Sequence, residues 1–249
     1  MNNETSNNET NIIFGRNPVL EAIRSGREID RLYIAHGVTS GSISEIIAKC
    51  SARGILIKEI SSQKLDYYCN GGNHQGVALM IASHEYSTVE EILEFAKTRN
   101  ESPFIIICDE IEDPHNLGAI IRTAESCGVH GIIIPKRRSA SLNATVAKTS
   151  AGALEYMRVA RVTNIANTID LLKKEGVWIF GADMDGKDYK KFDYSVPLAL
   201  IIGNEGKGIG TLTRKKCDEI ISLPMRGKIN SLNASVAAVI LMYEVLKHR

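Results

Sequence analysis

The stretch Leu198-Ala-Leu-Ile-Ile-Gly203-Asn-Glu205-Gly-Lys-Gly208 decides the fold of the second half of the chain. Its apolar run has the length of a buried strand, and it breaks at Gly203 into a glycine-rich loop. Such a loop exposes backbone N–H and C=O groups that a small ligand can approach closely. The stretch therefore predicts a ligand site at the carboxyl edge of an α/β sheet, and Glu205 stands at that edge.

A second stretch, Leu223-Pro-Met-Arg-Gly-Lys-Ile-Asn-Ser231-Leu-Asn233, completes this region. This stretch is typical of a strand end and a turn. A long helix is expected to begin at Ser231 and to run to Lys247. This helix is apolar nearly all round, which indicates burial on both sides. Its polar first turn is expected to face whatever the glycine loop faces.

Upstream of the glycine loop, apolar runs of strand length alternate with helical patterns. Strands are expected at 104–108, 131–134, 157–162, 177–182, 198–202 and 219–223, with helices at 114–127, 143–149, 165–175 and 210–217. The alternation predicts a parallel sheet covered by helices on both faces.

The front of the chain predicts a smaller α/β domain over residues 11–82. Its first helix is expected to start at Asn17, with Asn as the cap and Pro18 as the first helical residue. Residues 1–10 are polar and predict a disordered tail. The stretch 83–103, with a charged helix over residues 88–99, is expected to be the linker and domain boundary, which leaves 104–249 as the second domain.

Composition narrows the class of protein. The 249 residues carry a formal net charge of +1, so a nucleic-acid partner has to be held by a local basic patch. Lys136-Arg137-Arg138 could belong to such a patch, or be a solvated loop. The five scattered cysteines include no Cys-x-x-Cys pair, which argues against a disulfide framework and a zinc site. No run has membrane-spanning length, and we expect a cytoplasmic protein without a metal.

The helix at 114–127 contains the residues best suited to an anion or a ribose. Gly118 and Ala119 leave room for Arg122 to lie along the helix and present its guanidinium, although Arg122 could equally be a surface salt-bridge partner. Asn116 is six residues earlier, so on a regular helix it points about 120° away from Arg122. The glycine loop lacks the order of residues in a P-loop or a dinucleotide-binding fingerprint.

These segments together resemble the SpoU (TrmH) branch of the SPOUT methyltransferases. The resemblance lies in Asn116-x-Gly-x-Ile-x-Arg-Thr-Ala, in Ile202-Gly-Asn-Glu-Gly, and in Leu223-Pro-Met-x-Gly-x-x-x-Ser-Leu-Asn-x-Ser-Val-Ala-Ala. In the front domain, Gly15-Arg-Asn-Pro-Val and His74-Gln-Gly-Val are similar to a ribosomal-protein-like, RNA substrate-binding domain. That domain is found in members of the RlmB type, which methylate a guanosine ribose in 23S ribosomal RNA.

The resemblance implies a trefoil knot in the parallel-sheet domain, a homodimer through the C-terminal helix, and S-adenosyl-L-methionine as the methyl donor for a ribose 2′-oxygen. Its implied catalytic residues are Arg122, Asn116, Glu205, Ser231 and Asn233. Its implied cofactor residues are Gly203, Leu223, Leu232, Met225 and Asn233. The polar loop Cys69–Gly76 is either a nucleotide-binding loop or a plain turn. This loop and the resemblance together suggest the following RNA-binding residues: Arg16, Asn17, His74, Gln75, Lys136, Arg137 and Arg138.

Two other functions stay open at this point. The same catalytic domain could methylate transfer RNA, and a non-catalytic RNA-binding protein could keep the fold. The role of Arg122 is also open: the pKa of arginine is above about 12, so we expect it to orient the ribose and stabilise the alkoxide rather than act as a simple base.

Overall fold

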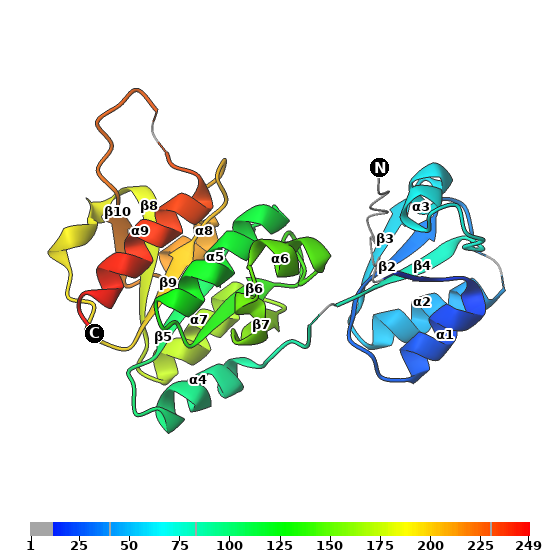
Figure 1. The fold of residues 1–249 in the computed structure, drawn as a ribbon, viewed down its shortest axis with the longest axis horizontal. Helices are drawn as coiled ribbons and strands as arrows, with labels where there is room; N and C mark the ends of the chain where they lie inside the picture. Colours follow the sequence, from blue (N-terminus) through cyan, green and yellow to red (C-terminus); the bar gives the residue numbers. More distant parts are fainter. Residues whose placement is uncertain (1–11, 40, 83, 230) are drawn as a thin grey trace, which may run out of the picture. The chain divides into compact units, whose positions relative to one another are not determined.

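The computed structural model describes residues 12–39, 41–82, 84–229 and 231–249, and the chain divides into two compact units. Unit 1 contains residues 1–85 and 141–144, and unit 2 contains residues 86–140 and 145–249. The disordered tail predicted over residues 1–10 lies outside the described residues. Figure 1 shows the elements of each unit.

Unit 1 is built on a four-stranded mixed sheet with the order β1-β4-β2-β3. Strands β1 and β2 both pair antiparallel to β4, and β2 pairs parallel to β3. One face packs against α1 and α2 through Val19, Leu32, Ile43, Ile46 and Leu79, all fully buried or nearly so. The elements are β1 (Ile12–Phe14), α1 (Arg16–Arg24), β2 (Ile29–Ala35), α2 (Ser42–Ala52), β3 (Leu56–Ile60), α3 (Ser62–Tyr68) and β4 (Val77–Ile81).

Helix α1 begins earlier than the sequence predicts. Its N-cap is Gly15 with φ +88°, and Arg16 is its first residue, so Asn17 is not the cap and Pro18 is the third helical residue. The side-chain oxygen of Gln75 accepts a 3.0 Å hydrogen bond from the Arg16 N–H. Because a distant residue satisfies this N–H, the helix does not need the local asparagine cap.

Unit 2 contains a six-stranded sheet in which every pair of strands is parallel, in the order β10-β8-β9-β5-β6-β7. This confirms the predicted parallel sheet. Its elements are α4 (Val89–Thr98), β5 (Phe104–Cys108), α5 (Pro114–Ser126), β6 (Gly131–Pro135), α6 (Ala144–Thr149), β7 (Val159–Val162), α7 (Ile165–Lys174), β8 (Trp178–Asp188), β9 (Leu198–Ile202), α8 (Thr211–Lys215), β10 (Glu219–Ser222) and α9 (Ala234–Leu246).

Helices cover both faces of this sheet. Helices α4 and α7 bury Ile92, Ile169 and Leu172 against alternate residues of β5 and β9, while α5 and α9 pack against each other on the other face (Figure 1). All five residues of β5 and all five of β9 are buried. Two-sided burial explains why these strands read as continuous apolar runs rather than as alternating patterns.

Helix α4 corrects the linker predicted over residues 83–103. Thr88 and Glu91 form a capping box, and Ile92 is fully buried in the core of unit 2. A Cβ on Gly131 would lie 2.5 Å from the Ile92 side chain, so the two residues are closely fitted. The unit boundary therefore falls between residues 85 and 86. The helix predicted over residues 88–99 is present, but its buried face makes it part of unit 2 rather than of a linker.

Two further boundaries differ from prediction. Strand β8 continues to Asp188, and a register shift between Ile220 and Ile221 lets β10 follow it. Helix α9 begins at Ala234 rather than at Ser231, because the Asn233 side chain accepts hydrogen bonds from the N–H groups of Ser235 and Val236 and caps the helix there. Among the described residues, no helix has the length and apolar character needed to cross a membrane.

Candidate active site

A cavity of about 210 Å³ opens at the carboxyl ends of β8, β9 and β10 in unit 2. It lies between the glycine loop that follows β9 and the segment that joins β10 to α9. Its walls combine apolar side chains with backbone groups and two carboxylates. The lining residues used below are Asp183, Gly203, Asn204, Glu205, Lys207, Ile221, Leu223, Met225, Ser231, Leu232, Ala237 and Leu241.

The glycine loop closes on itself. Asn204 and Gly208 exchange two backbone hydrogen bonds of 3.0 and 2.8 Å, and the Asn204 side chain accepts the Gly206 N–H at 2.9 Å. A Cβ on Gly203 would lie only 2.3 Å from the backbone of Gly208, so this position excludes any side chain. The loop thus presents its backbone to the cavity.

The end of β5 holds this loop in place. Asp109 accepts the Gly210 N–H at 2.8 Å, and the carbonyl of Glu110 accepts a 3.0 Å hydrogen bond from the Asn204 side chain. Burial raises the pKa of Asp109, while its hydrogen bonds to Gly210 and Thr213 act in the opposite direction. Both ends of the loop are therefore fixed to the segment between β5 and α5.

Three side chains from separate elements meet beside the cavity. Asn116 Nδ2 donates to Glu205 Oε1 at 2.7 Å, and Asn233 Nδ2 donates to the same oxygen at 2.5 Å and to Asn116 Oδ1 at 3.0 Å. The Ala234 N–H also approaches Glu205 Oε1 at 3.3 Å. Glu205 therefore places its carboxylate at the positive end of α9, where a negative charge is stabilised. Among the described residues, no hydrogen bond reaches its other oxygen, Oε2.

The predicted site residues separate into two groups. Asn116, Glu205 and Asn233 form the hydrogen-bonded network, and a second set lines the cavity, namely Gly203, Leu223, Met225, Ser231 and Leu232. Asn116 reaches Glu205 from the first turn of a regular helix and is nearly buried.

Arg122 lies apart from both groups. It is exposed on α5, it does not line the cavity, and its side chain forms no ion pair or hydrogen bond with any described residue. It follows Asn116 by six positions on the helix, which corresponds to about 9 Å along the axis and 120° around it. The surface salt bridge considered above is therefore not formed within the described part of the chain.

The structure adds site residues that the sequence reading did not single out. Asp183 lines the cavity, receives an N–H from Met184 at 2.8 Å and pairs with Arg214 at 2.6 Å. Asn204 fixes the loop, and Ile221 and Leu241 form apolar wall. The placement of Asp183 beyond the predicted strand 177–182 could have indicated it, because ligands bind at the carboxyl ends of parallel strands.

In unit 1, the two segments that carry the front-domain resemblance lie together. Arg16 Nε donates to the Gln75 carbonyl at 3.3 Å, and Gln75 has a left-handed φ of +52°. His74 uses both ring nitrogens, one as acceptor for the Gly76 N–H at 3.0 Å and one toward Asp66 at 2.9 Å. His74 therefore holds the loop, whereas Asn17 and Gln75 are exposed and Arg16 is half-buried.

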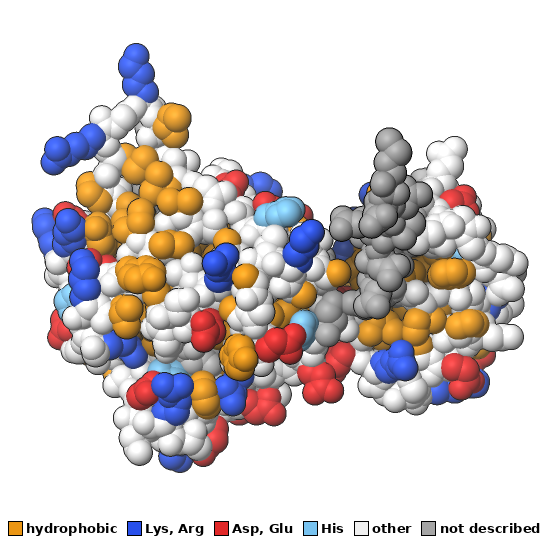
Figure 2. Space-filling view, in the orientation of Figure 1, with side chains coloured by type: hydrophobic (Ala, Val, Ile, Leu, Met, Phe, Trp, Pro, Cys, Tyr) orange, Lys and Arg blue, Asp and Glu red, His pale blue; other side chains and the backbone are white. Residues whose placement is uncertain are grey.

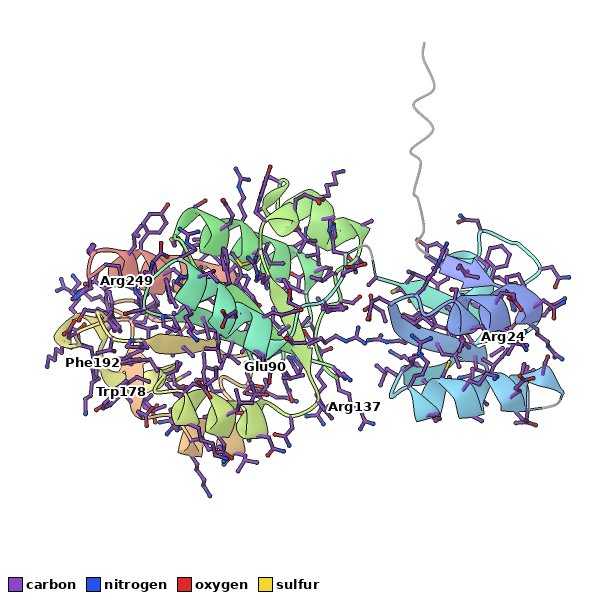
Figure 3. All side chains as sticks on the ribbon, turned by 90° about the horizontal axis from the view of Figure 1, so that it is seen from below. Arg24, Glu90, Arg137, Trp178, Phe192 and Arg249 are labelled. Atoms are coloured by element: carbon purple, nitrogen blue, oxygen red, sulfur yellow. The ribbon has the colours of Figure 1, made fainter. Side chains whose placement is uncertain are left out.

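The basic triplet belongs to unit 2. Arg138 has a left-handed φ of +55° and pairs with Glu110 at 2.7 Å. Lys136 and Arg137 follow β6 and have no ion pair among the described residues, and Figure 3 labels Arg137 at the end of that strand. Two of the three predicted RNA contacts here therefore keep an unpaired charge.

Comparison with known sequences gives two family matches. Residues 103–243 match the SpoU rRNA methylase family, and residues 12–87 match a family described as RNA 2′-O ribose methyltransferase substrate binding. A Bacillus subtilis protein, YacO, is 47% identical over 238 residues, which cover 95% of each chain. A Staphylococcus haemolyticus protein is 45% identical over 96% of each chain. Both are named as members of the TrmH family of tRNA/rRNA methyltransferases.

Solved structures give the same fold. An AdoMet-bound rRNA methyltransferase from Sinorhizobium meliloti is 26% identical, with a TM-score of 0.60, and the match covers 95% of this chain and 87% of that one. The SpoU methyltransferase AviRb from Streptomyces viridochromogenes, at 23% identity and a TM-score of 0.60, shares the fold over 95% of this chain and 89% of its own.

Proposed function

The chain belongs to the SpoU rRNA methylase family, and we propose that it transfers the methyl group of S-adenosylmethionine to the 2′-oxygen of a ribose, that of a guanosine, in 23S ribosomal RNA. The observation that carries this proposal is the Asn116–Glu205–Asn233 network beside the glycine-loop cavity. It puts polar groups from three elements next to a backbone-lined pocket.

The cavity suits the cofactor in its chemistry. S-adenosylmethionine, when bound, supplies a methyl group on a positively charged sulfonium. The apolar wall of Ile221, Leu223 and Leu241 suits its adenine, and the backbone of the Gly203 loop offers hydrogen-bonding groups. The carboxylates of Asp183 and Glu205 lie in the same lining and favour a positively charged ligand.

The network has a direct role for the incoming hydroxyl. Glu205 Oε1 is held by three N–H donors, which leaves Oε2 to accept a hydrogen bond from a ribose hydroxyl. Asn116 and Asn233 fix the carboxylate, and the Ser231 hydroxyl at the cavity wall adds a further donor or acceptor. Alignment of the 2′-oxygen is the main demand of an in-line displacement, and these residues supply it.

Arg122 requires a different arrangement. Its distance along α5 keeps it from the cavity of its own chain, yet α9, which packs against α5, exposes the apolar side chains Val236, Tyr243 and Leu246. Figure 2 shows hydrophobic side chains gathered over this helix. We place a second copy of the chain on this face, so that Arg122 orients the ribose and the adjacent phosphate in a homodimer. Sedimentation of Tyr243→Glu tests this: we expect a monomer with little activity.

The front domain supports ribosomal RNA as the substrate. The Arg16–Asn17 helix start and the Gln75 turn form one polar surface of unit 1, which we assign to RNA binding. His74 supports this surface by holding the loop, and the triplet at 136–138 is assigned to RNA binding separately, in unit 2. The trefoil knot is part of the same proposal. The contact of Glu205 with Asn233 and Ala234 supports it, because it brings the C-terminal segment against the glycine loop.

The deciding experiment is a transfer assay with methyl-labelled S-adenosylmethionine on unmodified large-subunit ribosomal RNA and, separately, on transfer RNA, followed by mapping of the 2′-O-methyl site. We expect label in one ribosomal guanosine. Glu205→Gln is expected to lower turnover about 100-fold while cofactor binding persists.

Other outcomes overturn parts of the proposal. Label only in transfer RNA would keep the chemistry and refute the role given to the front domain. Cofactor binding without transfer to either RNA would contradict the substrate assignment. Failure to bind the cofactor would favour a non-catalytic RNA-binding protein.

A further inference from the structure

Two segments border the cavity, and each carries exposed cations. Lys207 is in the glycine loop, and Arg226 and Lys228 are in the segment between β10 and α9. We propose that Lys207, Arg226 and Lys228 bind the phosphates of a single-stranded or looped RNA segment on either side of the methylated nucleotide. This rests on the proposed function and adds a binding site in unit 2 to the RNA-binding residues named above.

These three residues differ in ion pairing from the other cations near the cavity. Arg214 is paired with Asp183 and Asp185, and Lys187 is paired with Glu219. Lys207, Arg226 and Lys228 form no ion pair or side-chain hydrogen bond with any residue in the described ranges. Their positive charge is therefore left for an external anion.

The nearby carboxylates do not offset this charge. Asp183 already has the guanidinium of Arg214 as its partner. Glu205, two positions from Lys207, is turned into the network with Asn116, Asn233 and the Ala234 N–H. Asp183 and Glu205 are thus held by partners inside unit 2, whereas Lys207 at the cavity wall and Arg226 and Lys228 in the adjoining segment are exposed. These three cations can meet a polyanion that lies across the cavity opening.

The segment between β10 and α9 also presents apolar groups. Ile229 is 73% exposed, and Met225 lines the cavity while remaining 40% exposed. The segment projects from the unit, and Lys and Arg side chains stand out at its end (Figures 1 and 2). An exposed isoleucine next to cations can pack on the face of an unstacked base beside its phosphates. This combination favours RNA over a small anion.

The test compares charge removal at the cavity with charge removal elsewhere. The double variant Arg226→Gln/Lys228→Gln and the single variant Lys207→Gln are compared with Lys97→Gln/Lys174→Gln. Lys97 and Lys174 are exposed in the last turns of α4 and α7, which lead into the amino ends of β5 and β8. They therefore lie at the opposite edge of the sheet.

The measurements are the KM for ribosomal RNA and the binding of a labelled mixed-sequence single-stranded RNA, each over a range of salt concentrations. Each lost phosphate contact is expected to lower the slope of log affinity against log salt by about 0.7, so the double variant loses about 1.4. Its KM is expected to rise about tenfold, with little change in kcat or in cofactor affinity. Ile229→Ser is expected to weaken RNA binding without changing the slope.

Unchanged salt slopes in the cavity variants, or equal changes in the Lys97/Lys174 control, would overturn the inference. Loss of cofactor affinity in the double variant would also overturn it, because the cations would then serve the cofactor. Absence of methyl transfer by the unsubstituted protein would refute the proposed function instead, and the RNA-binding slopes would still decide the fate of the three cations.

Discussion

Asn233 Nδ2 donates a 3.0 Å hydrogen bond to Asn116 Oδ1, although 117 positions separate the two residues in the chain. Asn116 is in the first turn of α5 and Asn233 caps α9, so the bond joins the starts of two packed helices. Both amides also donate to the same oxygen of Glu205. One carboxylate oxygen thus unites three segments that the resemblance treats as separate motifs.

The first prediction concerns this pair of asparagines. Asn116→Ala and Asn233→Ser are each expected to lower kcat/KM about 100-fold, and the double variant is expected to lose much less than the product, because each residue acts through the other. Serine keeps a good N-cap for α9, so Asn233→Ser should retain thermal stability. Fully multiplicative losses in steady-state kinetics would show that the two amides act independently.

Gly203 and Gly206 form a matched pair for the cofactor loop. Gly203→Ala places a Cβ 2.3 Å from the Gly208 backbone, whereas the nearest atom to a Cβ on Gly206 is 3.6 Å away. We expect Gly203→Ala to reduce cofactor affinity at least tenfold and Gly206→Ala to change it less than threefold, because only the first must open the loop. Calorimetric titration with S-adenosylmethionine measures both. Equal effects would contradict the closed form of the loop.

The buried side chain of His130 is expected to make the stability of the fold depend on pH. Its Nδ1 accepts the Phe104 N–H at 3.0 Å and its Nε2 faces Glu101 at 2.9 Å, so the ring is neutral with the proton on Nε2. Burial lowers its pKa from 6.5, although Glu101 acts in the opposite direction. As the pH falls, the unfolded chain binds the proton first, so stability declines from about pH 6.5 downward through the folded pKa.

Thermal unfolding between pH 7 and 5 tests this prediction. His130→Gln is expected to flatten the decline of Tm over that range. The control His36→Gln, at an exposed histidine, is expected to leave the decline unchanged. The same decline in the wild type and in His130→Gln would assign the pH dependence to other groups.

Arg249 is expected to contribute to the stability of the folded protein. Arg249 donates hydrogen bonds to the carbonyls of Ser102, Pro103 and Val196 at 2.6 to 3.2 Å, and its guanidinium lies 5.0 Å from the centre of the Phe104 ring. Figure 3 labels it at the end of α9. Arg249→Ala should destabilise the protein by about 2 kcal/mol, because charged hydrogen bonds and ring packing are lost together. Lys247→Ala, two positions earlier in the sequence, should leave Tm nearly unchanged.

Much of unit 2 could be predicted from local pattern. The apolar runs Phe104–Cys108 and Leu198–Ile202 predict strands that are buried on both faces, and in the structure they are neighbours in a parallel sheet. The helix predicted to begin at residue 114 does begin there, and the Asp113 side chain caps it. Local pattern did not predict the start of α1, because the distant residue Gln75 fixes that boundary. It predicted the charged helix α4, but not that the apolar face of this helix packs into the core of unit 2.

By itself, the sequence determined the strands and most of the helices, the glycine loop after Leu198–Ile202, and the residue types that the site requires. Periodicity and turn chemistry are local, so they can be read from neighbouring residues. Only the tertiary structure decided that Asn116, Glu205 and Asn233 converge while Arg122 does not. That outcome depends on the strand order, on the closure of the loop from Gly203 to Gly208, and on the packing of α5 against α9, which are contacts between residues far apart in the chain.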